Sequence, residues 1–269
     1  MSHITPLTRQ EAIVGATIGN YVVSERLGAG AMGTVYLGVH PEIHKKVAIK
    51  VLSRRLSEDT AMVGRFMSEA RSIAMLDHPN IVETYDFGVL PDGRNYYTME
   101  YLQGETLSER LKREPLTIKE IKGIFYRICD ALYVIHSHGI VHRDLKPSNI
   151  FLAWRADRPV VKLIDFGVAK IGGGAAHPGE RGTVVGHVLG TPAYMSPEQA
   201  MGMVDDLNHL SDIFSLGVIL YKILTDRYPL TGESAAEVAL YYSLYDPIPI
   251  WHINPELPEA LGQVVMTCL

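Results

Sequence analysis

His142–Asn149 reads His-Arg-Asp-Leu-Lys-Pro-Ser-Asn, and the interpretation of the whole chain can start from these eight residues. A helix-periodic apolar segment precedes them and a short apolar run follows. Pro147 cannot sit inside a helix, so we predict a loop between a helix and a strand. Asp144 could accept a hydroxyl proton, Lys146 could face an anion, and Asn149 could offer oxygen to Mg²⁺. A polar turn is the alternative for any short piece of this loop.

Composition sets the class of protein. The chain has 269 residues, a net charge of −5 and 47% hydrophobic residues, which is typical of a globular protein without a nucleic-acid-binding charge balance. Two cysteines are too few for a disulfide framework, and no apolar run approaches a membrane span. We expect no membrane contact within this stretch and a cytoplasmic location, either of the protein or of the cytoplasmic part of a longer, membrane-anchored one.

The sequence pattern of the first part of the chain predicts a β-hairpin. Residues 1–20 show no firm pattern and are expected to form a loosely held lead-in. Tyr21–Leu27 and Thr34–Val39 read as strands joined by the glycine-rich turn Gly28–Gly33. A helix would follow such a turn in a dinucleotide fold, whereas here a strand follows. A flexible hairpin tip remains the alternative.

A sheet with one main helix should follow the hairpin. Val47–Leu52 is an apolar strand interrupted by Lys50, and a helix is predicted from about residue 57 to 76, with Glu69 beside its apolar stripe. Ile81–Phe87 and Tyr96–Glu100 complete five predicted strands. Residues 100–104 then change in character toward a linker.

The second half reads as mainly helical. A helix with an apolar stripe from Ile118 to Ile135 leads into the loop 142–149, and Val160–Ile164 is a strand that ends at Asp165. Residues 171–179 are rich in glycine, and a mobile segment is expected there. Ser211–Tyr221 should open with a helix cap at Ser211 and form a buried helix.

Four motifs in order resemble those of protein kinases: Gly-x-Gly-x-x-Gly at 28–33, Val-Ala-Ile-Lys at 47–50, the octet at 142–149, and Asp-Phe-Gly at 165–167. The segment 190–200 is similar in wording to bacterial kinases of eukaryotic (Hanks) type, although Ser196 stands where the family has Ala. The resemblance implies an α+β bilobal fold. Its parts would be a five-stranded antiparallel lobe with one main helix (21–99), a hinge (100–104) and a larger helical lobe (105–269). Family members continue further, so we expect a truncated C-terminus with Glu198 lacking its arginine partner.

The resemblance also assigns site residues. Asp144 would be the catalytic base, Lys146 would steady the γ-phosphate, Lys50 would pair with Glu69, and Thr191 would hydrogen-bond the catalytic loop. Asn149 and Asp165 would hold metal. ATP would contact a larger set, consisting of Leu27, Gly28, Ala29, Gly30, Gly33, Val35, Ala48, Lys50, Met99, Glu100, Leu102, Lys146, Asn149, Phe151 and Asp165. Asp212 would hold the backbone of the catalytic loop.

The implied activity is serine/threonine protein phosphorylation with ATP and two Mg²⁺ ions, for which Mn²⁺ could substitute. The implied partners are protein substrates bearing Ser or Thr and a second copy for autophosphorylation, with no nucleic acid. Thr183 would be a regulatory phosphorylation site whose phosphate pairs with Arg143. The alternatives are a pseudokinase scaffold, an inactive truncated fragment, and a small-molecule phosphotransferase of related fold.

Overall fold

The computed structural model describes residues 13–30, 32–155, 158–166 and 192–269. The chain divides into two compact units. The first contains the chain up to Asp77 together with Val82–Gln103, and the second contains His78–Ile81 and Gly104–Leu269. Among the described residues, no helix is long and apolar enough to cross a membrane.

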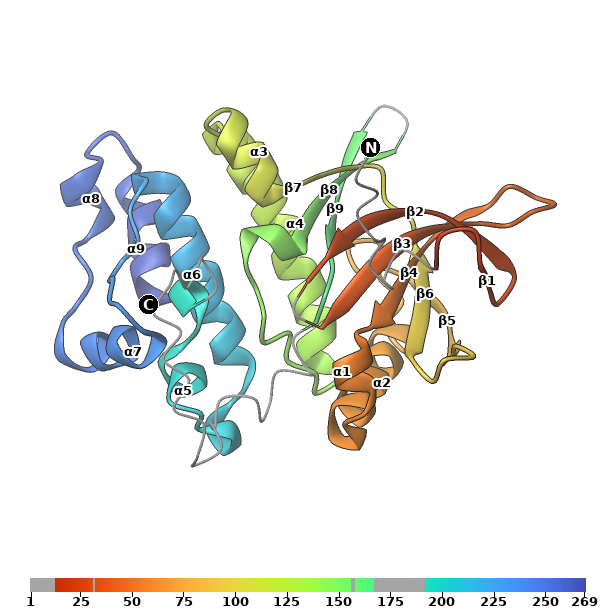
Figure 1. Cartoon of the computed structure of the whole chain (residues 1–269). Coiled ribbons are helices and arrows are strands. Elements are labelled where there is room, and N and C mark those ends of the chain that lie inside the picture. Colours follow the sequence, from red (N-terminus) through yellow and green to blue (C-terminus); the bar gives the residue numbers. More distant parts are fainter. Residues whose placement is uncertain (1–12, 31, 156–157, 167–191) are drawn as a thin grey trace, which may run out of the picture. The chain divides into compact units, whose positions relative to one another are not determined.

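The first unit is built on an antiparallel sheet whose order is β1-β2-β3-β4-β6-β5 (Figure 1). It has six strands where the sequence predicted five, because a short strand precedes the glycine-rich hairpin. The strands are β1 (Thr17–Ile18), β2 (Tyr21–Ala29), β3 (Gly33–Val39), β4 (Lys46–Leu52), β5 (Thr84–Val89) and β6 (Asn95–Glu100).

The extra strand belongs to a core that the lead-in prediction missed. Ile13 and Ile18 are 5% and 2% exposed, and they pack in a cluster with apolar side chains of the sheet. Thr17 and Ile18 pair with Val22 and Tyr21 of β2. Two isoleucines five residues apart give too weak a pattern to predict burial, but the sheet supplies an apolar face for them to cover.

Two helices accompany the sheet, α1 (Arg54–Ser57) and α2 (Thr60–Ala74), where the sequence predicted one. Asp59 separates them because its carboxylate accepts hydrogen bonds from the backbone N–H groups of Ala61 and Met62 and so caps α2. The predicted strand at Ile81–Phe87 also begins too early. Ile81 forms a single parallel bridge with Leu163 in the second unit, and β5 starts at Thr84.

Gly33 shows how closely the sheet constrains the glycine-rich hairpin. A Cβ at this position would lie 2.0 Å from the carbonyl oxygen of Val51. Gly28 and Gly30 differ, since a Cβ on either would meet no atom of the described residues within 4 Å. Packing within the protein therefore explains the glycine at 33 but not those at 28 and 30.

The second unit combines a small sheet with helices. The antiparallel sheet β7-β8-β9 consists of β7 (Gly104–Thr106), β8 (Ile150–Arg155) and β9 (Arg158–Leu163). The helices are α3 (Leu107–Arg113), α4 (Ile118–Ser137), α5 (Pro197–Ala200), α6 (His209–Thr225), α7 (Ala235–Leu244), α8 (Ile250–Ile253) and α9 (Glu259–Thr267). Within this unit α6 lies beside α9, and α5 beside α7 (Figure 1).

Helix α6 is buried along most of its length, as its sequence predicted, but its start differs. Asn208 is the N-cap and its side chain accepts a hydrogen bond from the N–H of Leu210. Ser211 therefore lies inside the first turn, and its hydroxyl donates to a carboxylate oxygen of Glu198. Glu198, which was expected to lack an arginine partner, thus has Ser211 as a hydrogen-bond donor.

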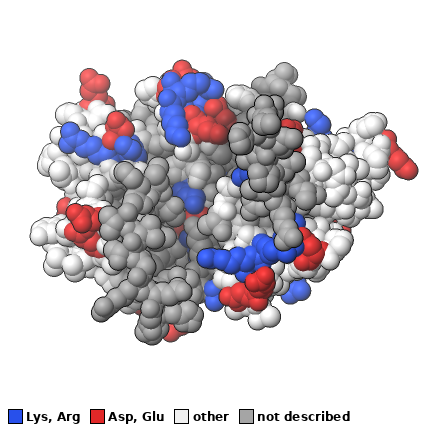
Figure 2. Space-filling model, in the orientation of Figure 1, with Lys and Arg blue, Asp and Glu red and all other residues white. Residues whose placement is uncertain are grey.

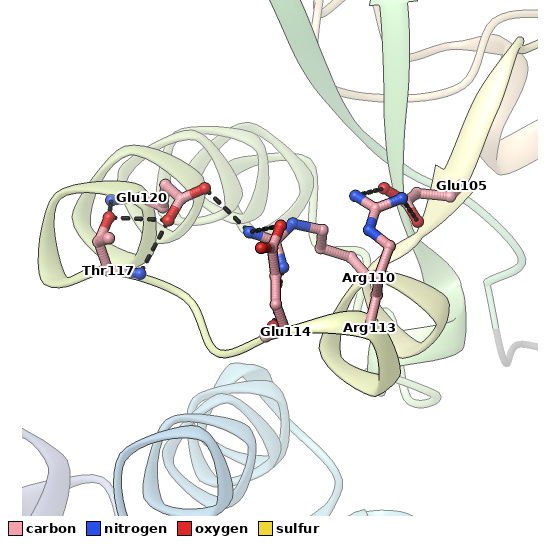
Figure 3. A network of polar contacts seen from close by, with 6 residues as sticks. All are labelled: Glu105, Arg110, Arg113, Glu114, Thr117 and Glu120. Carbon is pink, nitrogen blue, oxygen red and sulfur yellow. Dashed lines mark hydrogen bonds and ion pairs between the residues drawn. The ribbon is translucent and has the colours of Figure 1, made fainter.

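A network of charged side chains fixes the connection from β7 through α3 to α4 (Figure 3). Arg110 is buried and its guanidinium contacts the carboxylates of Glu114 and Glu120 at 3.2 and 3.1 Å. Arg113 forms a two-pronged pair with Glu105, with N–O distances of 2.9 and 3.2 Å. Because Glu120 also completes the capping box of α4, one set of contacts joins two helix ends.

Candidate active site

A buried ion pair lies in the first unit. Lys50 of β4 and Glu69 of α2 are 7% and 0% exposed, and Lys50 Nζ lies 3.2 Å from Glu69 Oε1. Taking both charges out of water is costly, so such a pair persists when further hydrogen bonds and good geometry support it. The hydroxyl of Tyr97 supplies one such bond, 3.3 Å from the same oxygen.

The residues expected to bind ATP in this unit differ in exposure. Leu27 is 42% exposed, and Gly28, Ala29 and Gly30 lie at the end of β2. Ala48 and Met99 are buried cross-strand partners, while Val35 is half-buried opposite Lys50. The remaining expected residues are Gly33 at the start of β3, the buried Glu100 at the end of β6, and the half-buried Leu102 in the following linker.

In the second unit, Asp212 of α6 holds the start of the loop 142–149. Its two carboxylate oxygens accept hydrogen bonds from the backbone N–H groups of His142 and Arg143, each at 2.8 Å. His136, in the last turn of α4, lies 2.8 Å from the oxygen that serves His142. The predicted role of Asp212 in holding the loop backbone is confirmed by these contacts.

The far end of the same loop gathers the candidate catalytic groups. Asp144 Oδ2 lies 3.0 Å from Lys146 Nζ and 2.8 Å from Asn149 Nδ2. Asn149 Nδ2 also donates to the backbone oxygens of Asp144 and Asp165, at 2.8 and 3.3 Å. These contacts bring the base candidate, the cation and both metal-ligand candidates together within one unit.

The backbone around these groups is unusual. Arg143 and Asp165 have φ values of 65° and 52°, a region that non-glycine residues rarely adopt. The neighbouring His142 is fully buried and stacks on Phe166 at a centroid distance of 4.5 Å. Burial lowers the pKa of His142 below 6.5, against an opposing effect of the Asp212 charge. A neutral His142 can then accept the hydrogen bond from the N–H of Asp144 through Nδ1.

The environment of Arg143 is also unusual. Its Nε is buried and has no hydrogen-bond partner among the described residues. Burial lowers the pKa of its guanidinium, while Asp212 partly opposes that effect. The carbonyl of Arg143 accepts a hydrogen bond of 2.8 Å from Gln199, which links α5 to the loop.

Sequence reasoning missed three residues of these clusters: Tyr97, His136 and Gln199. None belongs to a short recognisable motif, and each contacts a residue at least 28 positions away in sequence. Phe151, expected to contact ATP, is half-buried in β8. Thr183 and Thr191 lie outside the described residues.

The residues at the loop's end suit a hard divalent cation. Asn149 uses its amide nitrogen as a donor, so its carbonyl oxygen is the end available as a ligand, and Asp165 offers a carboxylate. No cluster of three or more His, Cys, Asp or Glu occurs in the part of the chain that the structure describes. The donor set therefore fits Mg²⁺, which is bound by one or two protein oxygens and completes its shell with water and phosphate.

Charge on the visible surface is mixed. On the face in Figure 2, basic and acidic side chains lie next to one another, in keeping with the net charge of −5.

Taken together, an antiparallel sheet with a buried Lys–Glu pair, and a helical unit with this Asp, Lys and Asn loop, define a protein kinase. The model of the protein kinase domain matches residues 21–263. The chain is 40% identical over 261 residues to the serine/threonine-protein kinase Pkn1 of Myxococcus xanthus, and 39% identical over 253 residues to PknB of Mycobacterium tuberculosis. These alignments cover 97% and 93% of this chain but 36% and 39% of the relatives.

A solved structure agrees. The kinase domain of Mycobacterium tuberculosis PknI superposes with a TM-score of 0.68 at 26% identity, covering 95% of this chain and 91% of that one. The chain therefore belongs to the protein kinase domain family. Use of ATP and a divalent metal goes with this family, and the α+β kinase fold predicted from the sequence is confirmed. The chain spans well under half the length of these two curated relatives.

Proposed function

We propose that the protein transfers the γ-phosphate of ATP to serine and threonine hydroxyls of proteins, with Asp144 as the catalytic base. The observation that carries this proposal is the contact set at the loop's end. Lys146 and Asn149 both hold Asp144 Oδ2, at 3.0 and 2.8 Å, which fixes the orientation of the carboxylate. A base held in this way can orient and deprotonate an incoming hydroxyl, while Lys146 places its charge beside the transferring phosphate.

The other site residues take supporting roles in this proposal. Lys50, oriented by Glu69, would bind the α- and β-phosphates of ATP, and the open space at Gly28 and Gly30 would let backbone N–H groups approach phosphate. Leu27, Val35, Ala48, Met99 and Phe151 would contact the adenine ring, and Glu100 and Leu102 would bind its edge through backbone groups. Asn149 and Asp165 would hold Mg²⁺, which supplies charge neutralisation when bound.

Several finer points belong to the same proposal. We assign residues 21–99 to the smaller lobe, 100–104 to a hinge and 105–269 to the larger lobe. Two Mg²⁺ ions would bind, with Mn²⁺ as a substitute, and two copies would associate for phosphorylation of Thr183. The buried Nε of Arg143, which lacks a partner in the described structure, supports a role for that residue in receiving phosphate. A cytoplasmic location of the domain is also proposed.

The test is transfer of labelled γ-phosphate from ATP with Mg²⁺. We expect label on Ser or Thr of a protein substrate and none on small alcohols or aminoglycosides. Asp144→Asn should abolish transfer while Mg²⁺-dependent ATP binding persists, and Asp165→Asn should weaken both. Asp226→Asn, at a side chain that is 99% exposed, is the matched control and should leave transfer unchanged. Mg²⁺-dependent ATP binding without any transfer by the unaltered chain would instead indicate a pseudokinase.

A further inference from the structure

The buried ion pair of the first unit has a third member, Tyr97 of β6. Its hydroxyl lies 3.3 Å from Glu69 Oε1, the oxygen that also accepts from Lys50 Nζ at 3.2 Å. Its ring lies under the same ammonium, with Lys50 Nζ 5.6 Å from the ring centroid. One side chain therefore contacts the anion through a donor and the cation through a π face.

The sheet register and the helix together hold Tyr97 in this place. Lys50 and Tyr97 are directly paired across β4 and β6, which brings their side chains together on one face of the sheet. Tyr97 is 1% exposed and packs on Phe66 of α2 at a centroid distance of 5.1 Å. Since Phe66 and Glu69 are three residues apart, they share a face of α2, and Tyr97 touches that face twice.

Because Tyr97 and Glu69 are both buried, the hydrogen bond from the Tyr97 hydroxyl matters for the orientation of the Glu69 carboxylate. A phenylalanine would fill the same space and present the same ring face to Lys50, but it would have no donor for Glu69. A buried tyrosine hydroxyl normally has a hydrogen-bond partner, and a buried carboxylate requires donors to offset its lost hydration. The hydroxyl thus orients the carboxylate that in turn orients Lys50.

We propose that Tyr97 is a positioning residue for ATP binding and phosphate transfer, which it supports by holding Glu69 toward Lys50. The proposal rests on the proposed role of Lys50 in binding the phosphates of ATP. It concerns the hydroxyl in particular, so its effect should depend on the presence of the Glu69 carboxylate.

A double-mutant cycle on the whole chain tests this dependence. Tyr97→Phe should lower kcat/KM for ATP about tenfold, as expected for loss of a hydrogen bond to a charged group. In a Glu69→Gln background the same substitution should lower kcat/KM for ATP by less than about twofold, because the charge of the partner has already been removed. Equal losses in both backgrounds would show that Tyr97 acts by packing alone and would overturn the proposal.

Tyr96→Phe is the matched control. Tyr96 is the neighbouring residue of β6, is 8% exposed, and packs in the core cluster that contains Ile13 and Ile18. Because successive side chains of a strand point to opposite faces of the sheet, the Tyr96 hydroxyl lies on the face away from Glu69, and its removal should leave kcat/KM unchanged. Should Tyr97→Phe fail to give a cooperative melt, the same cycle with Tyr97→Met decides the question.

A second measurement does not require catalysis. Arylation of Lys50 by dinitrofluorobenzene, followed by peptide mass spectrometry, reports the accessibility and reactivity of its amine. Loss of the Tyr97 hydroxyl should loosen the pair and speed the labelling of Lys50 at a given pH, whereas Tyr96→Phe should not. Unchanged labelling in Tyr97→Phe would refute the proposal. Absence of phosphate transfer by the unaltered chain would refute the proposed function and leave this readout intact.

Discussion

Asp212→Asn should weaken the second unit because an amide cannot replace a carboxylate with donors on both oxygens. The carboxylate is fully buried and accepts from three donors: the N–H groups of His142 and Arg143, and the ring of His136. An amide oxygen in the place of Oδ2 keeps the contacts to His142 and His136. The amide NH₂ then faces the N–H of Arg143, and two donors oppose each other.

The expected loss in the free energy of unfolding follows from that one contact. A hydrogen bond to a charged group contributes about 1.5–3 kcal/mol, and a buried donor left without a partner costs about 1–3 kcal/mol. Part of this is offset because the buried charge is also removed, so we expect a loss of about 3 kcal/mol. The opposite amide orientation breaks two contacts and would cost more.

Tryptophan fluorescence during urea unfolding measures this loss of unfolding free energy in the second unit, which contains Asp212. Trp154 and Trp251 are the two tryptophans of the chain, and both belong to the second unit. The free energies come from linear extrapolation of the transitions. Asp226→Asn, at the exposed end of the same helix, should leave the midpoint in place. A loss below about 1 kcal/mol for Asp212→Asn would refute the view that Asp212 anchors the loop through hydrogen bonds.

Three further outcomes are expected. Gly33→Ala should prevent stable pairing of β3 with β4, whereas Gly30→Ala should fold normally, as thermal melts by circular dichroism would show, because of these two glycines Gly33 is the one whose added Cβ would clash with described backbone. Arg110→Met should cost the second unit about 2 kcal/mol in urea, and Arg113→Met, whose side chain is 57% exposed, much less. Because the pKa of His142 is lowered by burial, the unfolding free energy of this unit should fall as pH drops below 6.5 toward the lowered value, and His142→Asn should reduce that fall.

Local patterns were sufficient for most elements of the fold. The apolar stripe of α4 and the strand–turn–strand pattern around Gly28–Gly33 depend on periodicity and turn chemistry, which neighbouring residues determine. The predicted helix starts were wrong at Asp59 and Asn208, which are the N-caps of α2 and α6. Apolar periodicity does not locate a cap, because the cap is the residue whose side chain reaches the first free backbone N–H groups. The predicted strand start at Ile81 was wrong for a different reason, because the backbone of Ile81 pairs with Leu163, which is far along the chain.

The sequence by itself determined the kinase family, the order of its motifs, and the residue types available for acid–base chemistry and metal binding, because these are local strings with a required chemistry. Only the tertiary structure decided which distant groups support them. Asp212 reaches the loop 142–149 across some seventy residues, and Tyr97 reaches Glu69 through the register of β4 and β6. Such contacts arise from packing between elements, and burial makes them energetically important because water cannot replace a missing partner there.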